Sequence, residues 1–243
     1  MSTLLRAELV KLRTTRTFVA LVGSALALSL TLVVLSVLLS DDLTTKDLRE
    51  LFAADFSSFF ILILGVIGMA GEWRHRTITS TVLAAPDRLR LLTAKTLSYA
   101  VAGAVLSLVV TLTIMVVGTV LLAVQDQPTL GIGDLADALW RNLLVAALLG
   151  AFGVCIGGLL RNQIVAMIGL LVFAFVLEPT LLGLVPEVGK FGPTGGAPNA
   201  ILEVDAFDDG EQLGPGVAVL VMLGWIALGF AAAAASLRRR DLV

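Results

Sequence analysis

The stretch FVALVGSALALSLTLVVLSVLL fills residues 18–39 and contains no charged side chain. A helix needs about 20 predominantly apolar residues to cross the hydrocarbon core of a bilayer. The apolar core of a secretory signal has about 7–15 residues, and this run of 22 is longer. We therefore expect a retained transmembrane helix, and the stretch places the chain among integral membrane proteins.

The composition of the whole chain agrees with this interpretation. Of its 243 residues, 58% are hydrophobic and 15% are charged, whereas soluble domains contain about 45–50% apolar and about 25% charged residues. Five further apolar runs lie at about 54–71, 96–124, 140–160, 164–185 and 216–236. Together the runs leave no room for a separate soluble domain. We predict an all-α integral membrane protein with six transmembrane helices in one domain, residues 1–243.

The basic residues predict the orientation of these helices, because cytoplasmic loops carry an excess of Lys and Arg. If the N-terminus lies inside, 13 of the 17 basic residues fall in inner segments. The outer segments then hold Lys46, Arg49, Arg141 and Lys190. Six spans return the C-terminus, with Arg238–Arg240, to the inside. We therefore expect both termini in the cytoplasm.

Residues 3–16 precede the first span and read TLLRAELVKLRTTR. Leu5, Leu9 and Leu12 follow helical spacing, and the basic side chains take other directions. This pattern favours an amphipathic helix in the membrane interface, with its basic side chains toward the headgroups. The alternative is a frayed basic tail.

The sequence lacks the residue sets that several kinds of chemistry need. Lys95-Thr96 is the only Lys-Thr pair, and no glycine occurs at 89–94 to form a phosphate-binding loop. One histidine, His75, and one cysteine, Cys155, do not supply a metal cluster. The net charge of −2 gives no sign of nucleic-acid binding. We expect a chain that is not an enzyme and holds no metal.

The charged loop between the second and third runs, Gly71–Leu97, has two interpretations. It opens with Glu72 close to arginines and continues with Ile78, Val82 and Leu83 at helical spacing. A compact helical loop on rigid helices offers a docking surface for a partner protein. The alternative is a solvated turn whose basic residues only fix the topology.

Glu178, beside Pro179 in the fifth run, also has two interpretations. A carboxylate inside a membrane span is costly and needs a partner, water or a proton. It is either a translocation-pathway or gating group, or a structural carboxylate that caps the backbone broken by Pro179. In the fourth run, Gly153 and Gly157 form a GxxxG pattern, which favours close packing within the bundle.

Several of these segments resemble one family of membrane proteins. The loop GEWRHRTI at 71–78, with LAAP at 83–86 and Ala94-Lys95, is similar to the loop between spans two and three of ABC-2 type permeases, particularly those of actinobacteria. LLRNQ at 159–163, FVLEP at 175–179 and the opening AExxKLR at 7–13 resemble the same family. One departure is Asp87, where the family pattern leads us to expect a basic residue.

The resemblance implies an exporter in the bacterial cytoplasmic membrane. Two multi-pass permease subunits, identical or paralogous, form the pathway, and two separate ABC ATPase subunits bind Mg-ATP beneath them. This chain then holds no cofactor itself. The N-terminal helix acts as a connecting helix, and the loop around residues 77–85 forms a cytoplasmic coupling helix that fits a groove of the ATPase. Residues 186–215 carry short re-entrant outer helices.

The resemblance also assigns roles to individual residues. The residues expected to couple the permease to the ATPase lie in the loop between spans two and three and in the turn before span five: Glu72, Trp73, Arg74, Thr77, Ile78, Val82, Leu83 and Arg161. The pathway is expected between spans two and five, lined or gated by Phe59, Phe60, Phe173, Phe175 and Glu178.

A second hypothesis is an auxiliary or immunity-type membrane protein, which binds a peptide or another partner without transport. The two hypotheses differ in whether a nucleotide-binding ATPase docks on the cytoplasmic loop.

Overall fold

The computed structural model describes residues 2–40, 42–53, 55–74, 87–160, 162–204 and 212–238, and every regular element in them is helical. The first part of the chain forms α1 Ser2–Thr14, α2 Arg16–Leu39, α3 Thr45–Ala53, α4 Ser57–Arg74, α6 Arg88–Val124 and α7 Ile132–Leu159. The second part forms α8 Gln163–Val172, the π-helical turn η1 Phe173–Leu177, α9 Glu178–Leu184, α10 Pro186–Gly189, α11 Gly196–Leu202 and α12 Pro215–Arg238.

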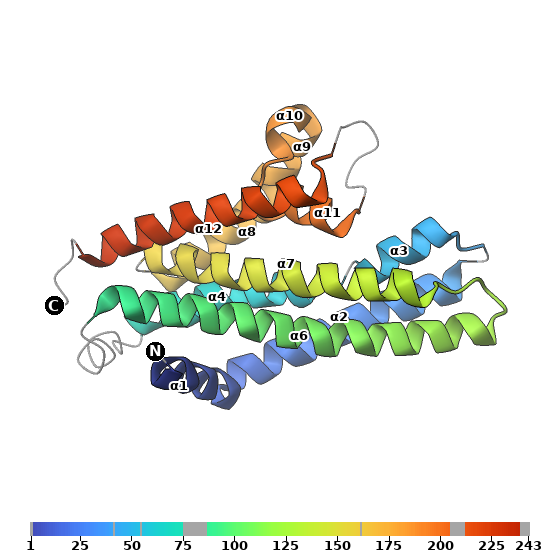
Figure 1. Ribbon diagram of the computed structural model, residues 1–243, viewed down its shortest axis with the longest axis horizontal. Coiled ribbons are helices and arrows are strands. Elements are labelled where there is room, and N and C mark those ends of the chain that lie inside the picture. Colours follow the sequence, from blue (N-terminus) through green and yellow to red (C-terminus); the bar gives the residue numbers. More distant parts are fainter. Residues whose placement is uncertain are drawn as a thin grey trace.

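Six helical segments are long and apolar enough to cross a membrane: α2, α3 with α4, α6, α7, α8 through α9, and α12. The prediction of a multi-pass helical membrane protein is confirmed at this level. Figure 1 shows the long helices α6 and α7 side by side along the molecule, and α1 lies at the same end as the close of α12. Both ends of the described chain therefore lie at one end of the bundle.

Three predicted spans have different boundaries in the structure. The second begins at Ser57 and ends at Arg74 instead of covering residues 54–71. The third and fourth helices begin earlier than residues 96 and 140, at Arg88 and Ile132. Hydropathy marks the apolar part of a helix, and the polar first turns of α6 and α7 extend beyond that part.

Asp87, the residue that departs from the family pattern, is the N-cap of α6. Its carboxylate accepts hydrogen bonds from the backbone N–H groups of Leu89 and Arg90, at 3.1 and 3.2 Å. An aspartate at this position satisfies N–H groups that have no partner within the helix. The basic stretch Arg88–Lys95 is therefore the start of one continuous helix that includes the third span.

The helix α3 lies between the first two apolar runs, where the sequence predicts no span because most side chains at 41–50 are polar or charged. Thr44 and Asp47 form a reciprocal cap at its start, with the Thr44 N–H 2.9 Å from the Asp47 carboxylate. Leu48, Leu51 and Phe52 recur at helical spacing and are all buried against α2, α6 and α7. The second span is thus preceded by a short amphipathic helix.

The helices α4 and α7 form the centre of the bundle. A methyl group on Gly153 would collide with the backbone oxygen of Leu62, and one on Gly157 with that of Val66. On the α4 side, a methyl group on Gly65 would lie 2.8 Å from the backbone oxygen of Gly150. Small residues let the two backbones approach closely. The GxxxG pattern therefore packs within this chain.

The fifth span is interrupted just before Pro179. The turn η1 is π-helical, and the N–H of Glu178 donates to the carbonyl of Phe173 instead of to a residue four positions back. Proline lacks an N–H and disturbs the regular helix, and π turns absorb such irregularities. Short helices, α10 and α11, follow within residues 186–215, and α11 packs on α7 and α12.

The N-terminal segment is a helix, not a frayed tail. Leu12 is 5% exposed and Leu9 37% exposed, so the predicted leucine stripe only partly faces the bundle. Among the side chains of α1 that the structure describes, Glu8 is also deeply buried, which the apolar pattern does not predict. The helix packs against α6 and α2.

Candidate functional site

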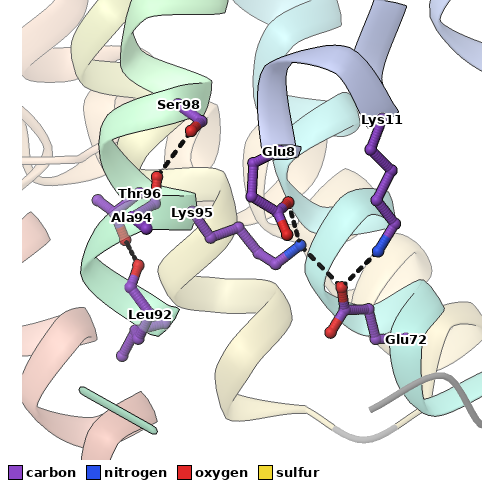
Figure 2. Close-up of polar contacts among 8 residues, drawn as sticks. All are labelled: Glu8, Lys11, Glu72, Leu92, Ala94, Lys95, Thr96 and Ser98. Carbon is purple, nitrogen blue, oxygen red and sulfur yellow. Dashed lines mark hydrogen bonds and ion pairs between the residues drawn. The ribbon is translucent and has the colours of Figure 1, made fainter. Parts of the chain in front are cut away.

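A buried ionic cluster joins α1, α4 and α6 at the end of the bundle where α1 lies (Figure 2). Lys95 of α6 is 1% exposed, and its Nζ donates to Glu8 Oε2 of α1 at 2.7 Å and to Glu72 Oε1 of α4 at 2.9 Å. The same Glu72 oxygen accepts a bond from Lys11 Nζ of α1 at 2.8 Å. Each of the three helices is thus tied to the other two.

The charges of this ionic cluster balance. Glu8, Glu72 and Lys95 are buried, and Lys11 lies at the edge with half of its side chain exposed. A charge removed from water is costly unless opposite charges and hydrogen bonds surround it. The ammonium of Lys95 is thus bound by two carboxylates, and the excess negative charge is offset only by Lys11 at the exposed edge.

A cavity of about 270 Å³ lies against the ionic cluster. Its polar lining includes all four charged residues, Tyr99 and Gln163, and its apolar lining includes Leu12, Leu64 and Ile67. Two acceptor atoms that are buried here, Glu72 Oε2 and Gln163 Oε1, have no hydrogen-bond partner in the part of the chain that the structure describes. This half-open cavity combines charged groups, an apolar wall and two buried acceptor atoms without a partner among the described residues.

The predicted coupling residues fall partly inside the described chain. Glu72 belongs to the ionic cluster, Trp73 is partly buried and Arg74 is exposed at the end of α4. Arg74 lines a hollow with Asn162, Gln163 and Ile164, so the end of α4 and the start of α8 lie together. The other five predicted coupling residues lie outside the described residues. They are Thr77, Ile78, Val82 and Leu83 of the loop, and Arg161 of the turn before span five.

The aromatic residues predicted to line a pathway are divided between two environments. Phe59 and Phe175 meet edge to face with ring centroids 5.3 Å apart, which brings the second and fifth spans into contact. Phe60 touches Phe59 but is buried in the core of the bundle with Leu64. Phe175 is 63% exposed and Phe173 partly exposed. The aromatic contact between the second and fifth spans is therefore made by Phe59 and Phe175, and Phe60 lies in the core.

Glu178 is held by a loop rather than by its own helix. It is 1% exposed, and its oxygens accept from the backbone N–H groups of Thr194, Gly195 and Gly196 at 3.0, 2.7 and 2.8 Å. The Thr194 hydroxyl donates to it as well. A methyl group on Gly192 would occupy the position of the carboxylate. The carboxylate therefore joins α9 to the start of α11. The irregular backbone before Pro179 is accommodated by the π turn, and Glu178 does not cap it.

A second buried polar group was not singled out from the sequence. Asp55 accepts from Ser57 Oγ at 2.6 Å and from the hydroxyls of Ser107 and Thr111 on α6. The amide of Asn142 on α7 donates to the carbonyl of Phe52 at 2.8 Å. Side chains of α6 and α7 thus provide hydrogen-bond partners for the Phe52 carbonyl and the Asp55 carboxylate, which lie between α3 and α4. Ser107 and Thr111 are four positions apart and so lie on one face of a helix, and this spacing could have predicted a buried polar group in the sequence.

Comparison with protein-family models and with curated proteins gave no match for this chain. Its function is therefore argued from its own residues.

Proposed function

We propose that the chain is the membrane-spanning permease subunit of an ABC-2 type exporter, working with a second permease subunit and with separate ATPase subunits. In this proposal both termini and the loop at 75–86 face the cytoplasm of a bacterium. ATP is bound and hydrolysed in the partner, because this sequence has no phosphate-binding loop.

The observation that supports the proposal most is the position of the ionic cluster. Glu72 lies near the end of α4 and Lys95 lies in the second turn of α6, so the cluster ties together the two helices on either side of residues 75–86. Glu8 and Lys11 add α1 to the same unit. A partner that moves the loop then moves three helices together, which a permease driven from the cytoplasm requires.

The neighbouring turn supports the same proposal. Arg74 and Asn162 line one hollow, so the end of the second span and the start of the fifth offer adjacent surfaces at one end of the bundle. The spans meet again near the other end of α4, at Phe59 and Phe175. Docking at this end would act on the two helices between which the pathway is proposed to run.

Site-specific crosslinking in the native host tests the proposal. A photoreactive residue at Leu83, within the proposed coupling loop, is expected to capture an ABC ATPase. The matched control is Thr129, an exposed position in the loop at the opposite end of the bundle, between α6 and α7. Equal capture from both positions, or capture of a protein without nucleotide-binding motifs from Leu83, would count for the auxiliary function instead.

A further inference from the structure

The cavity beside the ionic cluster contains acceptor atoms that its own donors do not satisfy. Glu72 is 3% exposed, and its Oε1 accepts from both Lys11 and Lys95, yet its Oε2 is buried with no partner among the described residues. Gln163 Oε1 is unpartnered as well and lies close to the Gly71 wall. An unpaired buried carboxylate oxygen is costly, so the site favours a ligand that donates hydrogen bonds.

The charges around the cavity select the sign of that ligand. The enclosed groups are the carboxylates of Glu8 and Glu72 and one ammonium, that of Lys95, whereas Lys11 is at the edge. An anion would meet the unpaired oxygen of Glu72 and be repelled. A primary ammonium group brings three N–H donors and a positive charge, and hydrogen bonds between charged partners are the stronger ones.

The size and the walls of the cavity indicate what carries the ammonium group. Its volume is about 270 Å³, whereas one water molecule occupies about 30 Å³ in the liquid. Leu12, Leu64 and Ile67 provide apolar wall next to the polar groups. A site with a charged end and an apolar wall fits the head and the first carbons of an amphiphile.

We propose that the cavity binds the primary ammonium group of an amphiphile, which donates to Glu72 Oε2 and Gln163 Oε1 while its tail lies against Leu64 and Ile67. An aminophospholipid and a soluble alkylamine share this chemistry. The inference does not rest on the proposed function, because binding requires no ATPase.

Calorimetric titration of the full chain in phosphatidylglycerol nanodiscs tests the proposal. The probe is octylammonium, and empty nanodiscs give the heat of partition into lipid. We expect one saturable site per chain for octylammonium. Octyltrimethylammonium has the same charge but no N–H group, and we expect it to bind at least about tenfold more weakly, since it cannot donate to the carboxylate.

Two variants separate the ligand from the fold. Glu72→Gln removes the charge, and we expect at least a tenfold loss of octylammonium affinity. Gln163→Met removes one acceptor but leaves the ionic cluster and the Asn162 cap of α8 in place, so a several-fold loss is expected with unchanged thermal stability. Gly169→Ala is the control, because a methyl group there meets nothing within 4 Å.

The lipid composition identifies the source of the ammonium group. If an aminophospholipid is the occupant, nanodiscs with phosphatidylethanolamine lower the apparent affinity of octylammonium, whereas discs with phosphatidylcholine do not. If a soluble amine is the occupant, the two lipids act alike. The proposal is overturned if octylammonium shows no saturable binding, if the trimethyl analogue binds equally well, or if both Glu72→Gln and Gln163→Met bind as the parent protein does.

Discussion

Lys95 makes the central contact of the ionic cluster that joins α1, α4 and α6. Its ammonium group is enclosed and bound by two carboxylates on different helices, at 2.7 and 2.9 Å. Removing it leaves Glu8 and Glu72 facing each other with Lys11 as the remaining cation. For a buried pair, loss of one partner costs more than the pair itself contributes, because an uncompensated charge stays buried.

We predict that Lys95→Met lowers the free energy of unfolding by about 3–5 kcal/mol. Thermal unfolding in mild detergent measures this loss. The control is Lys46→Met, since Lys46 is largely exposed and its pair with Glu50 spans 3.7 Å, and exposed pairs contribute about 0–1 kcal/mol. Equal melting temperatures for the two variants would mean that the cluster does not hold α1.

Glu178 gives a second prediction at this scale. In Glu178→Gln an amide N–H₂ replaces one oxygen that now accepts N–H bonds from Thr194–Gly196. Donor then faces donor, and we expect a loss of about 1–3 kcal/mol in the free energy of unfolding.

The matched control for this variant is Glu187→Gln, because the Glu187 side chain is 77% exposed. Protease protection of residues 186–204 gives a local readout beside the melting temperature. If Glu178→Gln leaves both unchanged, the carboxylate is not what fixes the loop, and its role in the pathway becomes the better interpretation.

At the scale of elements, the contact between α4 and α7 is set by glycines. We predict that Gly153→Ala lowers the free energy of unfolding by about 1–3 kcal/mol, because the added methyl group meets the backbone oxygen of Leu62 and cannot push a flexible side chain aside. The same change at Gly169, which faces open space, is the comparison. Similar stability of the two variants would show that the helices separate without cost.

The membrane-crossing elements could be predicted because long apolar runs have a single physical explanation. The runs that became α2 and α12 needed little correction. The helix α3 was missed because its four buried residues are too few to form a span and lie among charged ones: Leu48, Leu51, Phe52 and Ala53. The early start of α7 was missed because Asp134 and Asp137 are polar although helical.

The functional groups were predicted less completely than the spans, for a different reason. Glu72 was singled out as a charge at the end of a span, but its partners Lys11 and Lys95 are 61 and 23 positions away along the chain. Glu8, which shares Lys95 with it, is separated from Lys95 by 87 positions. Such pairings depend on how the helices pack, and no local pattern encodes them. Glu178 likewise finds its donors in a loop beyond its own helix.

At the scale of the whole molecule, the arrangement of the helices places α1 and the end of α12 together. We predict that this end is cytoplasmic. In a Cys155→Ala background, Thr129→Cys should react with a membrane-impermeant maleimide on intact cells, because residue 129 lies in an exposed loop at the other end. Thr14→Cys, exposed at the end of α1, should react only after the cells are permeabilised. The opposite labelling pattern would show that the end with α1 faces the outside of the cell.

The proposed role of this chain depends on whether it works with a nucleotide-binding partner. The most direct measurement is affinity purification of the chain from its native host in mild detergent, followed by mass spectrometry of everything that co-purifies. We predict a stoichiometric ABC ATPase, together with any second permease subunit. Recovery of a stable complex that contains other partners and no ATPase would contradict the permease proposal and leave residues 71–97 as a segment that fixes topology.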